Sequence, residues 1–317
     1  MKLTDKFGRT IDYLRISVTD RCNLRCVYCM PEKGVENIPH GEILCYEEIL
    51  KIVDVAISLG IKKIRITGGE PLVRKGIIDF LSELSQRKVD FSVTTNGILL
   101  GDFAGDLKKA GLRRINVSLD TLSAKKFSEI TRGGVLGKVI DGIVKAKAVG
   151  FEPIKINAVV LPDTSEGDIK TFVEFAKTNN LIIRFVEHLP FTGYRINQLV
   201  DIERSFQEKY NLIPTDVAGF GPGRHYKING ATIGFISALT LPFCRKCNRL
   251  RLTSDGKLLP CLSSLDFVDV KKAVRSHASD KEIKNLFFEA VKNKPEKHTF
   301  ENPRGCMTVK SMVNIGG

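Results

Sequence analysis

Short β-branched runs alternate with longer segments of helical period from residue 11 to about residue 190. The apolar runs predict six strands over Tyr13–Thr19, Lys63–Thr67, Phe91–Thr95, Ile115–Leu119, Ile154–Leu161 and Leu181–Glu187. Helical periodicity lies between them, over 46–59, 75–87, 102–110, 123–130, 135–149 and 166–179. Repeated strand–helix units predict an α/β fold with a parallel sheet, either open or curled into a barrel.

Polar residues recur at one end of these predicted strands, and we expect one face to collect them. The cysteine loop follows the first strand. The second strand ends in 67–71, the third in 94–97 and the fourth in 118–120, while the fifth carries Lys155 with Asn157 and the sixth ends in 184–188. In a (β/α) barrel the chemistry lies at the carboxyl ends of the strands. Residues 1–190 are therefore interpreted as an incomplete, TIM-like (β/α)6 barrel.

The character of the chain changes after residue 190. A polar helix is predicted over Gln198–Tyr210, a Gly/Pro-rich loop over 218–223, and a hairpin over His225–Ser237, which contains an Asn-Gly turn. Two more helices are predicted over 266–276 and 280–293. We interpret residues 191–317 as a second, α+β domain.

Composition and charge narrow the class of protein without naming a partner. Hydrophobic content of 43% and charged content of 27% are typical of a globular protein, and no apolar run approaches the ~20 residues of a membrane span. Eight cysteines without an export signal predict metal ligation in a reducing cytoplasm. The net charge of +13 favours a polyanionic partner, but the basic residues are spread along the chain. Charge alone does not distinguish RNA from a small phosphorylated substrate.

The first candidate metal site is Cys22, Cys26 and Cys29, spaced C-x3-C-x2-C. Three thiolates can hold three corners of a [4Fe–4S] cubane and leave the fourth iron open. Structural zinc would need a fourth ligand nearby, and only single residues, His40 and Cys45, follow. The spacing favours an iron–sulfur cluster.

The second candidate metal site is Cys244, Cys247 and Cys261, which a hairpin turning at 254–256 can bring together. Zinc is a stronger alternative here, with a fourth ligand from Cys306, His225 or Cys45. An iron–sulfur cluster is favoured because the chain already carries one cluster motif. Two arginines, Arg249 and Arg251, share one face of the intervening strand and would attract an anion to an open iron.

The first cysteine motif, with the aromatic Tyr28 before its third cysteine, resembles that of the radical S-adenosylmethionine (SAM) enzymes. More specific are Ser17–Arg21, Ile66–Leu72, the arginine-rich run Cys244–Arg251 and the terminal pair Gly316-Gly317. Together these motifs are similar to the GTP 3′,8-cyclases of molybdenum cofactor biosynthesis, over residues 8 to 317.

The resemblance implies a lyase reaction that uses two [4Fe–4S] clusters and SAM. A 5′-deoxyadenosyl radical removes hydrogen from C3′ of GTP, and the C3′ radical attacks C8 to give 3′,8-cyclo-7,8-dihydro-GTP. It also implies a reductant protein and product transfer to the cyclic pyranopterin monophosphate synthase, and it leaves a homodimer open. Neither nucleic acid nor a membrane is required.

The resemblance also assigns residues, position by position. It assigns the SAM cluster to Cys22, Cys26 and Cys29 and the second cluster to Cys244, Cys247 and Cys261. It assigns a catalytic tail to Gly316 and Gly317. SAM contacts fall to Tyr28, Gly69, Glu70, Ser118 and Leu189, the last being methionine in many members of the family. GTP contacts fall to Arg15, Arg65, Thr94, Lys155, Arg249, Leu250 and Arg251, to which we add Arg184.

Elementary chemistry agrees with a phosphate-binding interior. Arginine binds phosphate oxygens bidentately, and a charge that points inward from a barrel strand is costly without an anion. The alternative is that each cation faces outward or pairs with a carboxylate. Rival functions are a radical SAM enzyme acting on RNA or a peptide, and a non-enzymatic zinc or electron-transfer protein. No Walker motif occurs, so phosphate binding would depend on side chains.

Overall fold

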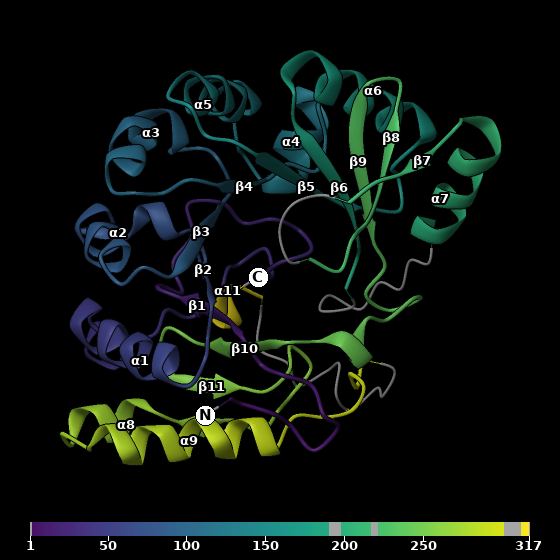
Figure 1. Cartoon of the computed structure of the whole chain (residues 1–317). Coiled ribbons are helices and arrows are strands. Elements are labelled where there is room, and N and C mark those ends of the chain that lie inside the picture. The colour runs from purple at the N-terminus through teal and green to yellow at the C-terminus, as the bar shows by residue number, and fades with distance from the viewer. Residues whose placement is uncertain (1, 190–197, 217–220, 301–311, 317) are drawn as a thin grey trace.

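A computed structural model describes residues 2–189, 198–216, 221–300 and 312–316. Six parallel strands form the centre of its sheet, in chain order (Figure 1). They are β1 (Tyr13–Ser17), β2 (Lys63–Thr67), β3 (Asp90–Thr95), β4 (Ile115–Ser118), β5 (Ile154–Val160) and β6 (Ile182–Glu187). All six match the strands that the sequence predicts.

Helices follow these strands and cover the outside of the arc that the strands form (Figure 1). They are α1 (Tyr46–Ser58), α2 (Ile77–Ser85), α3 (Leu100–Lys109), α4 (Ala124–Thr131), α5 (Leu136–Ala148) and α6 (Glu166–Asn179). Local sequence sets their ends. At α6, for example, Ser165 and Asp168 form a reciprocal capping box. Apolar stripes on the helices pack against the outward side chains of the strands, which places the core between the two layers.

The C-terminal part of the chain extends both edges of the same sheet. Beyond β6 lie β9 (Ala231–Ile236), β8 (Arg224–Ile228) and β7 (Ile213–Pro214), with α7 (Gln198–Lys209) before them. Beyond β1 lie β10 (Arg249–Leu252), β11 (Lys257–Leu259) and β12 (Val268–Asp269). Both β9 and β10 run parallel to their barrel neighbours. The predicted hairpin is confirmed, with Asn229 and Gly230 both at positive φ in its turn.

The sheet order is linear, so the barrel is open, as an incomplete (β/α)6 barrel requires. The short helix α11 (Met312–Ile315) lies inside the arc, close to β1 (Figure 1). Because strands from beyond residue 190 join the barrel sheet on both sides, the division of the chain at that residue stays a prediction.

One predicted helix, over 266–276, is wrong in its first half. Val268 and Val270 are buried while Asp269 is exposed, and this alternation is that of a strand. Val268 pairs with Leu258 of β11, and only α8 (Lys271–Arg275) is helical. The predicted helix that follows is confirmed as α9 (Asp280–Lys292).

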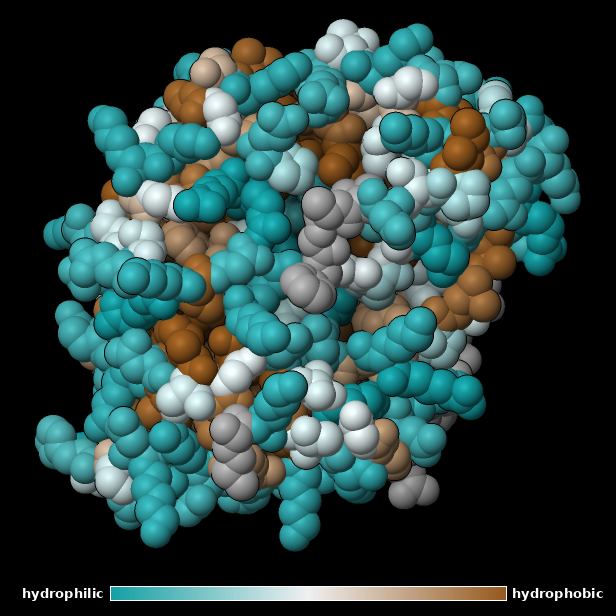
Figure 2. Space-filling model, viewed as in Figure 1, coloured by the Kyte–Doolittle hydropathy of each residue, from teal (hydrophilic) through white to brown (hydrophobic). Residues whose placement is uncertain are grey.

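Hydrophilic side chains dominate the visible face of the molecule, with hydrophobic ones scattered between them (Figure 2). Within the described residues, no helix combines the length and the apolar character needed to cross a membrane.

Candidate functional site

The first cysteine trio lies on the loop that follows β1. The loop is fixed to the end of α4 because Arg25 N donates to Thr131 O (3.2 Å) and Val27 N donates to Ile130 O (2.9 Å). Arg132 donates from there to two loop carbonyls at 3.0 Å each. The three thiols, of Cys22, Cys26 and Cys29, are half-buried and interact electrostatically with one another. Burial raises the pKa of Cys22 to about 11 and of Cys29 to about 12.

The segment after β2 packs directly against this cysteine loop. A Cβ atom on Gly69 would lie 2.4 Å from Arg21 O, so only glycine fits. The Glu70 carboxylate accepts from Leu72 N (3.0 Å), from Thr95 Oγ1 (2.8 Å) and from Asn96 N (2.6 Å). Burial raises its pKa to about 7. Glu70 therefore fixes the shape of its own loop, and its role as a SAM contact stays a prediction.

Tyr28 is held by a carboxylate that sequence reasoning left without a role. Its hydroxyl donates to Asp120 Oδ2 at 2.7 Å, and Asp120 Oδ1 accepts from Val159 N at 2.8 Å. Burial raises the pKa of Asp120 to about 6. The sequence signal was present, since Asp120 follows β4 two residues after Ser118.

The second cysteine trio lines one cavity of about 80 Å³. The hairpin of β10 and β11 returns Cys261 to Cys244 and Cys247, as predicted. Arg249, Arg251 and Leu189 line the same cavity, together with two residues that sequence reasoning missed, Lys294 and His298. The SAM role of Leu189 stays a prediction.

The fourth-ligand candidates for zinc do not lie at this cavity among the described residues. Cys45 is exposed at the start of α1, and His225 lies on β8 beside Arg184 and Lys155. Cys306 falls outside the described residues. Within the described part of the chain, no three His, Cys, Asp or Glu side chains are grouped as a single metal ion requires. A cubane does not require that grouping, because each thiolate binds a different iron.

The predicted GTP residues form a cationic interior. In the sheet register Arg15 lies between Arg65 on β2 and Arg251 on β10. Burial, then repulsion from Arg184 and Arg65, lowers the pKa of Lys155 to about 8. Burial, then repulsion from neighbouring arginines, lowers the pKa of Arg184 to about 9 and of Arg251 to about 10. Cations that repel one another inside a barrel are costly unless an anion joins them.

These cations do not share the face of the cysteine loop, so the expectation of one polar face is wrong in part. Lys155 is the second residue of β5, near its amino end. It lines a further small cavity with Arg65, Arg184 and two cations that the sequence analysis missed, Lys63 and Arg114. Lys63 could have been identified from the sequence, because it lies two residues before Arg65 and residues two apart on a strand share a face. The polar side chains thus line the interior over its depth.

Two other predicted GTP residues have different surroundings. Thr94 accepts from Arg65 Nη1 at 3.3 Å and so belongs to the cationic interior. Leu250 is fully buried in the hydrophobic core, which leaves only its backbone for a GTP contact. A tyrosine that sequence reasoning missed, Tyr13, accepts from Arg65 Nε at 3.0 Å.

The C-terminal tail lies in the barrel mouth. Arg251 Nη1 donates to Gly316 O at 2.5 Å. Gly316 has φ of +72°, and a Cβ atom there would lie 2.9 Å from Thr67 Cγ2 and 3.0 Å from Ser17 Cβ. Val313 is buried and faces Gly69. The ordinary expectation of a frayed end does not hold for 312–316, while Gly317 is outside the described residues.

Comparisons with known proteins agree with this architecture. The family model described as the radical SAM superfamily matches residues 16–176, and that described as Molybdenum Cofactor Synthesis C matches residues 181–300. The chain is 46% identical over 329 residues to a GTP 3′,8-cyclase of Thermodesulfovibrio yellowstonii, covering 99% of this chain and 100% of the relative. It is 43% identical over 330 residues to one of Petrotoga mobilis, with the same coverage. The crystal structure of Streptococcus suis SuiB shares the fold, with a TM-score of 0.63 at 19% identity, covering 91% of this chain and 68% of that chain.

Proposed function

The chain belongs to the GTP 3′,8-cyclase family of radical SAM enzymes, and on that premise we propose that it converts GTP to 3′,8-cyclo-7,8-dihydro-GTP. This reaction is the first step of molybdenum cofactor biosynthesis. The observation that carries the proposal is the arrangement of the barrel interior. Two separate cysteine trios belong to one open barrel, whose interior carries several arginines and a lysine.

Cys22, Cys26 and Cys29 suit a [4Fe–4S] cluster because three soft sulfur donors lie on one short, anchored loop. Gly69 lets the segment after β2 pack directly against that loop, and Tyr28 of the loop donates to Asp120, two residues beyond Ser118 at the end of β4. When bound, the cluster and SAM supply the 5′-deoxyadenosyl radical that removes hydrogen from C3′ of GTP. The chain's own contribution is to hold SAM and GTP in register and to keep water away.

The cationic interior supports a triphosphate as the substrate's anionic part. Arg15 and Arg65 lie on the neighbouring strands β1 and β2, and Lys155 and Arg184 lie on the neighbouring strands β5 and β6. The Nε atom of Arg184 is buried without a hydrogen-bond partner among the described residues, as is that of Arg249. Guanidinium groups of this kind match phosphate oxygens in geometry and charge.

We also propose that Cys244, Cys247 and Cys261 hold a second [4Fe–4S] cluster that meets the guanine of GTP. The donor set fits, because three sulfurs and two arginines line one cavity. Guanine nitrogen and oxygen atoms can bind an open iron, while Arg249 and Arg251 attract the anionic part of the nucleotide. A reducing cytoplasmic location, a separate reductant protein, transfer of the product to the cyclic pyranopterin monophosphate synthase and a homodimer belong to the same proposal.

Metal analysis tests the two clusters directly. The chain, reconstituted without oxygen, is expected to bind about eight iron atoms, since each cubane holds four. The Cys22/Cys26/Cys29→Ala variant is expected to keep about half of this iron and to lose SAM cleavage entirely. The Cys244/Cys247/Cys261→Ala variant is the matched control, expected to keep the other half. Stoichiometric zinc with little iron after anaerobic isolation would contradict the proposal.

A further inference from the structure

Lys294 is a lysine whose side chain is buried, with an exposed fraction of 2%. It follows α9 and lines the cavity of the second cysteine trio. Burying an ammonium group is expensive unless acceptors or anions surround it. The groups around Lys294 therefore indicate what it is for.

The ammonium group connects the two chain segments that carry Cys247 and Cys261. Lys294 Nζ donates to Arg249 O at 2.7 Å and to Pro260 O at 2.6 Å. The sulfur of Cys247 attracts it electrostatically. The two hydrogen bonds hold the ammonium group between these two segments and beside the cysteine sulfur. Lys294 is a positioning residue.

A second buried cation, Arg9, lies close by, but its charge is already balanced. Arg9 donates to Cys244 O (2.8 Å), Pro295 O (2.6 Å) and Glu296 O (3.0 Å), and it forms an ion pair with Asp5 at 2.5 Å. The anionic groups that attract Lys294 in the described part of the chain are the sulfurs of Cys247 and Cys261. Its charge is therefore directed at the cysteine trio.

We propose that Lys294 is the counter-ion of the second cluster, fixing two of its cysteines and favouring its reduced state. The inference depends on the second cluster of the proposed function. Net charge and hydrogen bonds to sulfur set the reduction potential of an iron–sulfur cluster. A one-electron reduction adds a negative charge to a site that already carries three thiolates. A buried ammonium group beside that site opposes the accumulation of negative charge.

Three substitutions separate the charge of Lys294 from its hydrogen bonds. Lys294→Gln can still donate to both carbonyls but has no charge. Lys294→Met loses the charge and the hydrogen bonds, whereas Lys294→Arg keeps the charge and the hydrogen bonds. Lys108→Met is the control, since Lys108 Nζ donates to a carbonyl, Gly150 O at 2.6 Å, on the far side of the barrel. Each is made in the full chain carrying Cys22/Cys26/Cys29→Ala, so that the second cluster alone gives the paramagnetic signal. Dithionite titration followed by electron paramagnetic resonance gives its midpoint potential.

The equilibrium constant for reduction is expected to fall about tenfold in Lys294→Gln, which is ~59 mV for one electron. Lys294→Arg and Lys108→Met are expected to stay near the parent chain. Loss of iron in Lys294→Gln but not in Lys294→Arg would also support the counter-ion role. An unchanged potential in an iron-loaded Lys294→Gln variant, or iron loss in both variants, would overturn it and leave a structural role. If the parent chain itself holds no second cluster, the proposed function fails at that point, independently of Lys294.

Discussion

Lys155 is a base whose protonation changes near neutral pH because of its surroundings. Burial and the nearby charges of Arg184, Arg65, Arg114 and Lys63 place its pKa at about 8. If Lys155 contacts the triphosphate as predicted, its contribution to GTP affinity is complete below this pKa and is lost above it. We expect the dissociation constant to rise by up to tenfold per pH unit above pH 8, measured by calorimetry.

Lys155→Arg is expected to remove this loss between pH 8 and 9, because arginine stays protonated there. Tyr13 also has a pKa lowered to about 8, where Arg65, Arg15 and Arg249 outweigh its burial, so it titrates in the same range. Tyr13→Phe isolates its share of the effect. An affinity that does not change with pH in the unsubstituted chain would contradict the role of Lys155.

Arg249 and Arg251 are expected to recognise the anionic part of GTP. Replacing both by alanine should weaken GTP binding by several kcal/mol together, at ~1.5–3 kcal/mol for each charge-assisted contact. SAM binding should change little. Arg113→Ala removes an exposed arginine and serves as the control. Equal losses of GTP and SAM binding in calorimetry would mean that the two arginines are structural.

The tail is an element whose catalytic role stays a prediction, and its position in the barrel mouth allows that role to be tested. Gly316→Ala would place a Cβ atom against Thr67 and Ser17 at a positive φ, and so would move the tail out of the barrel mouth. We expect product formation to collapse in this variant and in a chain that lacks Gly316 and Gly317. Iron content and GTP affinity should stay largely intact, while uncoupled release of 5′-deoxyadenosine continues.

Gly105→Ala is the matched control for the tail, because its Cβ atom would meet no atom within 4 Å on α3. Chromatographic quantitation of the cyclised product and of 5′-deoxyadenosine measures both outcomes. Product formation at the full rate in the truncated chain would show that the tail is only a chain end.

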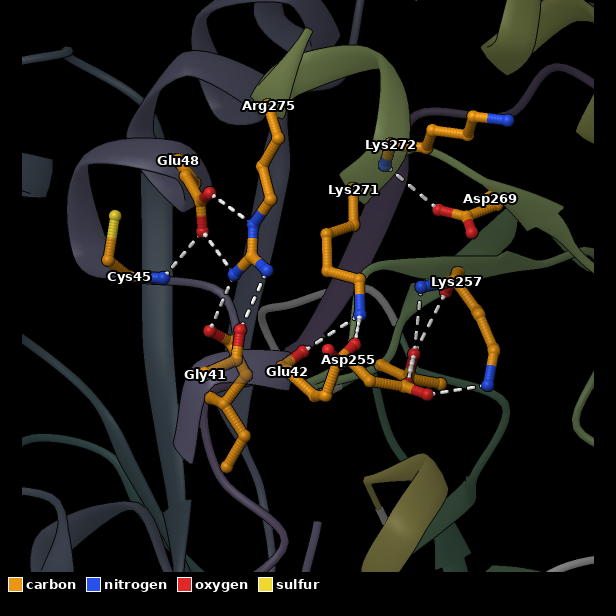
Figure 3. A network of polar contacts seen from close by, with 12 residues as sticks. Gly41, Glu42, Cys45, Glu48, Asp255, Lys257, Asp269, Lys271, Lys272 and Arg275 are labelled. Carbon is orange, nitrogen blue, oxygen red and sulfur yellow. Dashed lines mark hydrogen bonds and ion pairs between the residues drawn. The ribbon is translucent and has the colours of Figure 1, made fainter. Parts of the chain in front are cut away.

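A polar network attaches α8 to the segment that precedes α1 (Figure 3). Arg275 donates to Glu48 Oε1 (2.8 Å), to Gly41 O (2.7 Å) and to Ile43 O (3.1 Å). We expect Arg275→Ala to lower the free energy of unfolding by about 1–2 kcal/mol, measured in denaturant. Lys272→Ala should cost little, since the bond drawn for it to Asp269 comes from its backbone (Figure 3). Equal stability of the two variants would contradict this role.

The elements that the sequence predicts well are those with local signals. β1 to β6 have continuous apolar runs, and the first cysteine trio has a diagnostic spacing. The placement of β10 against β1 depends on contacts more than 230 residues apart, as between Asn248 and Asp12, and no local pattern encodes it. Lys294 was missed for the same reason, because a lone lysine after a helix is usually exposed.

For the whole molecule, the net charge predicts the class of partner, an anion, and the fold determines where that anion would bind. A net charge of +13 spread along the chain predicts only an anion. The sheet turns part of that charge inward, since its register brings Arg15, Arg65 and Arg251 side by side. Composition alone does not reveal this arrangement, because a globular protein with the same cations on its surface would have the same composition.

We propose above all that this barrel directs a SAM-derived radical to C3′ of GTP. The most direct measurement uses GTP deuterated at C3′, with mass spectrometry of the 5′-deoxyadenosine that the reduced, reconstituted chain releases. We expect that 5′-deoxyadenosine to gain one deuterium, together with formation of 3′,8-cyclo-7,8-dihydro-GTP. Unlabelled 5′-deoxyadenosine formed alongside the cyclised product would contradict the account.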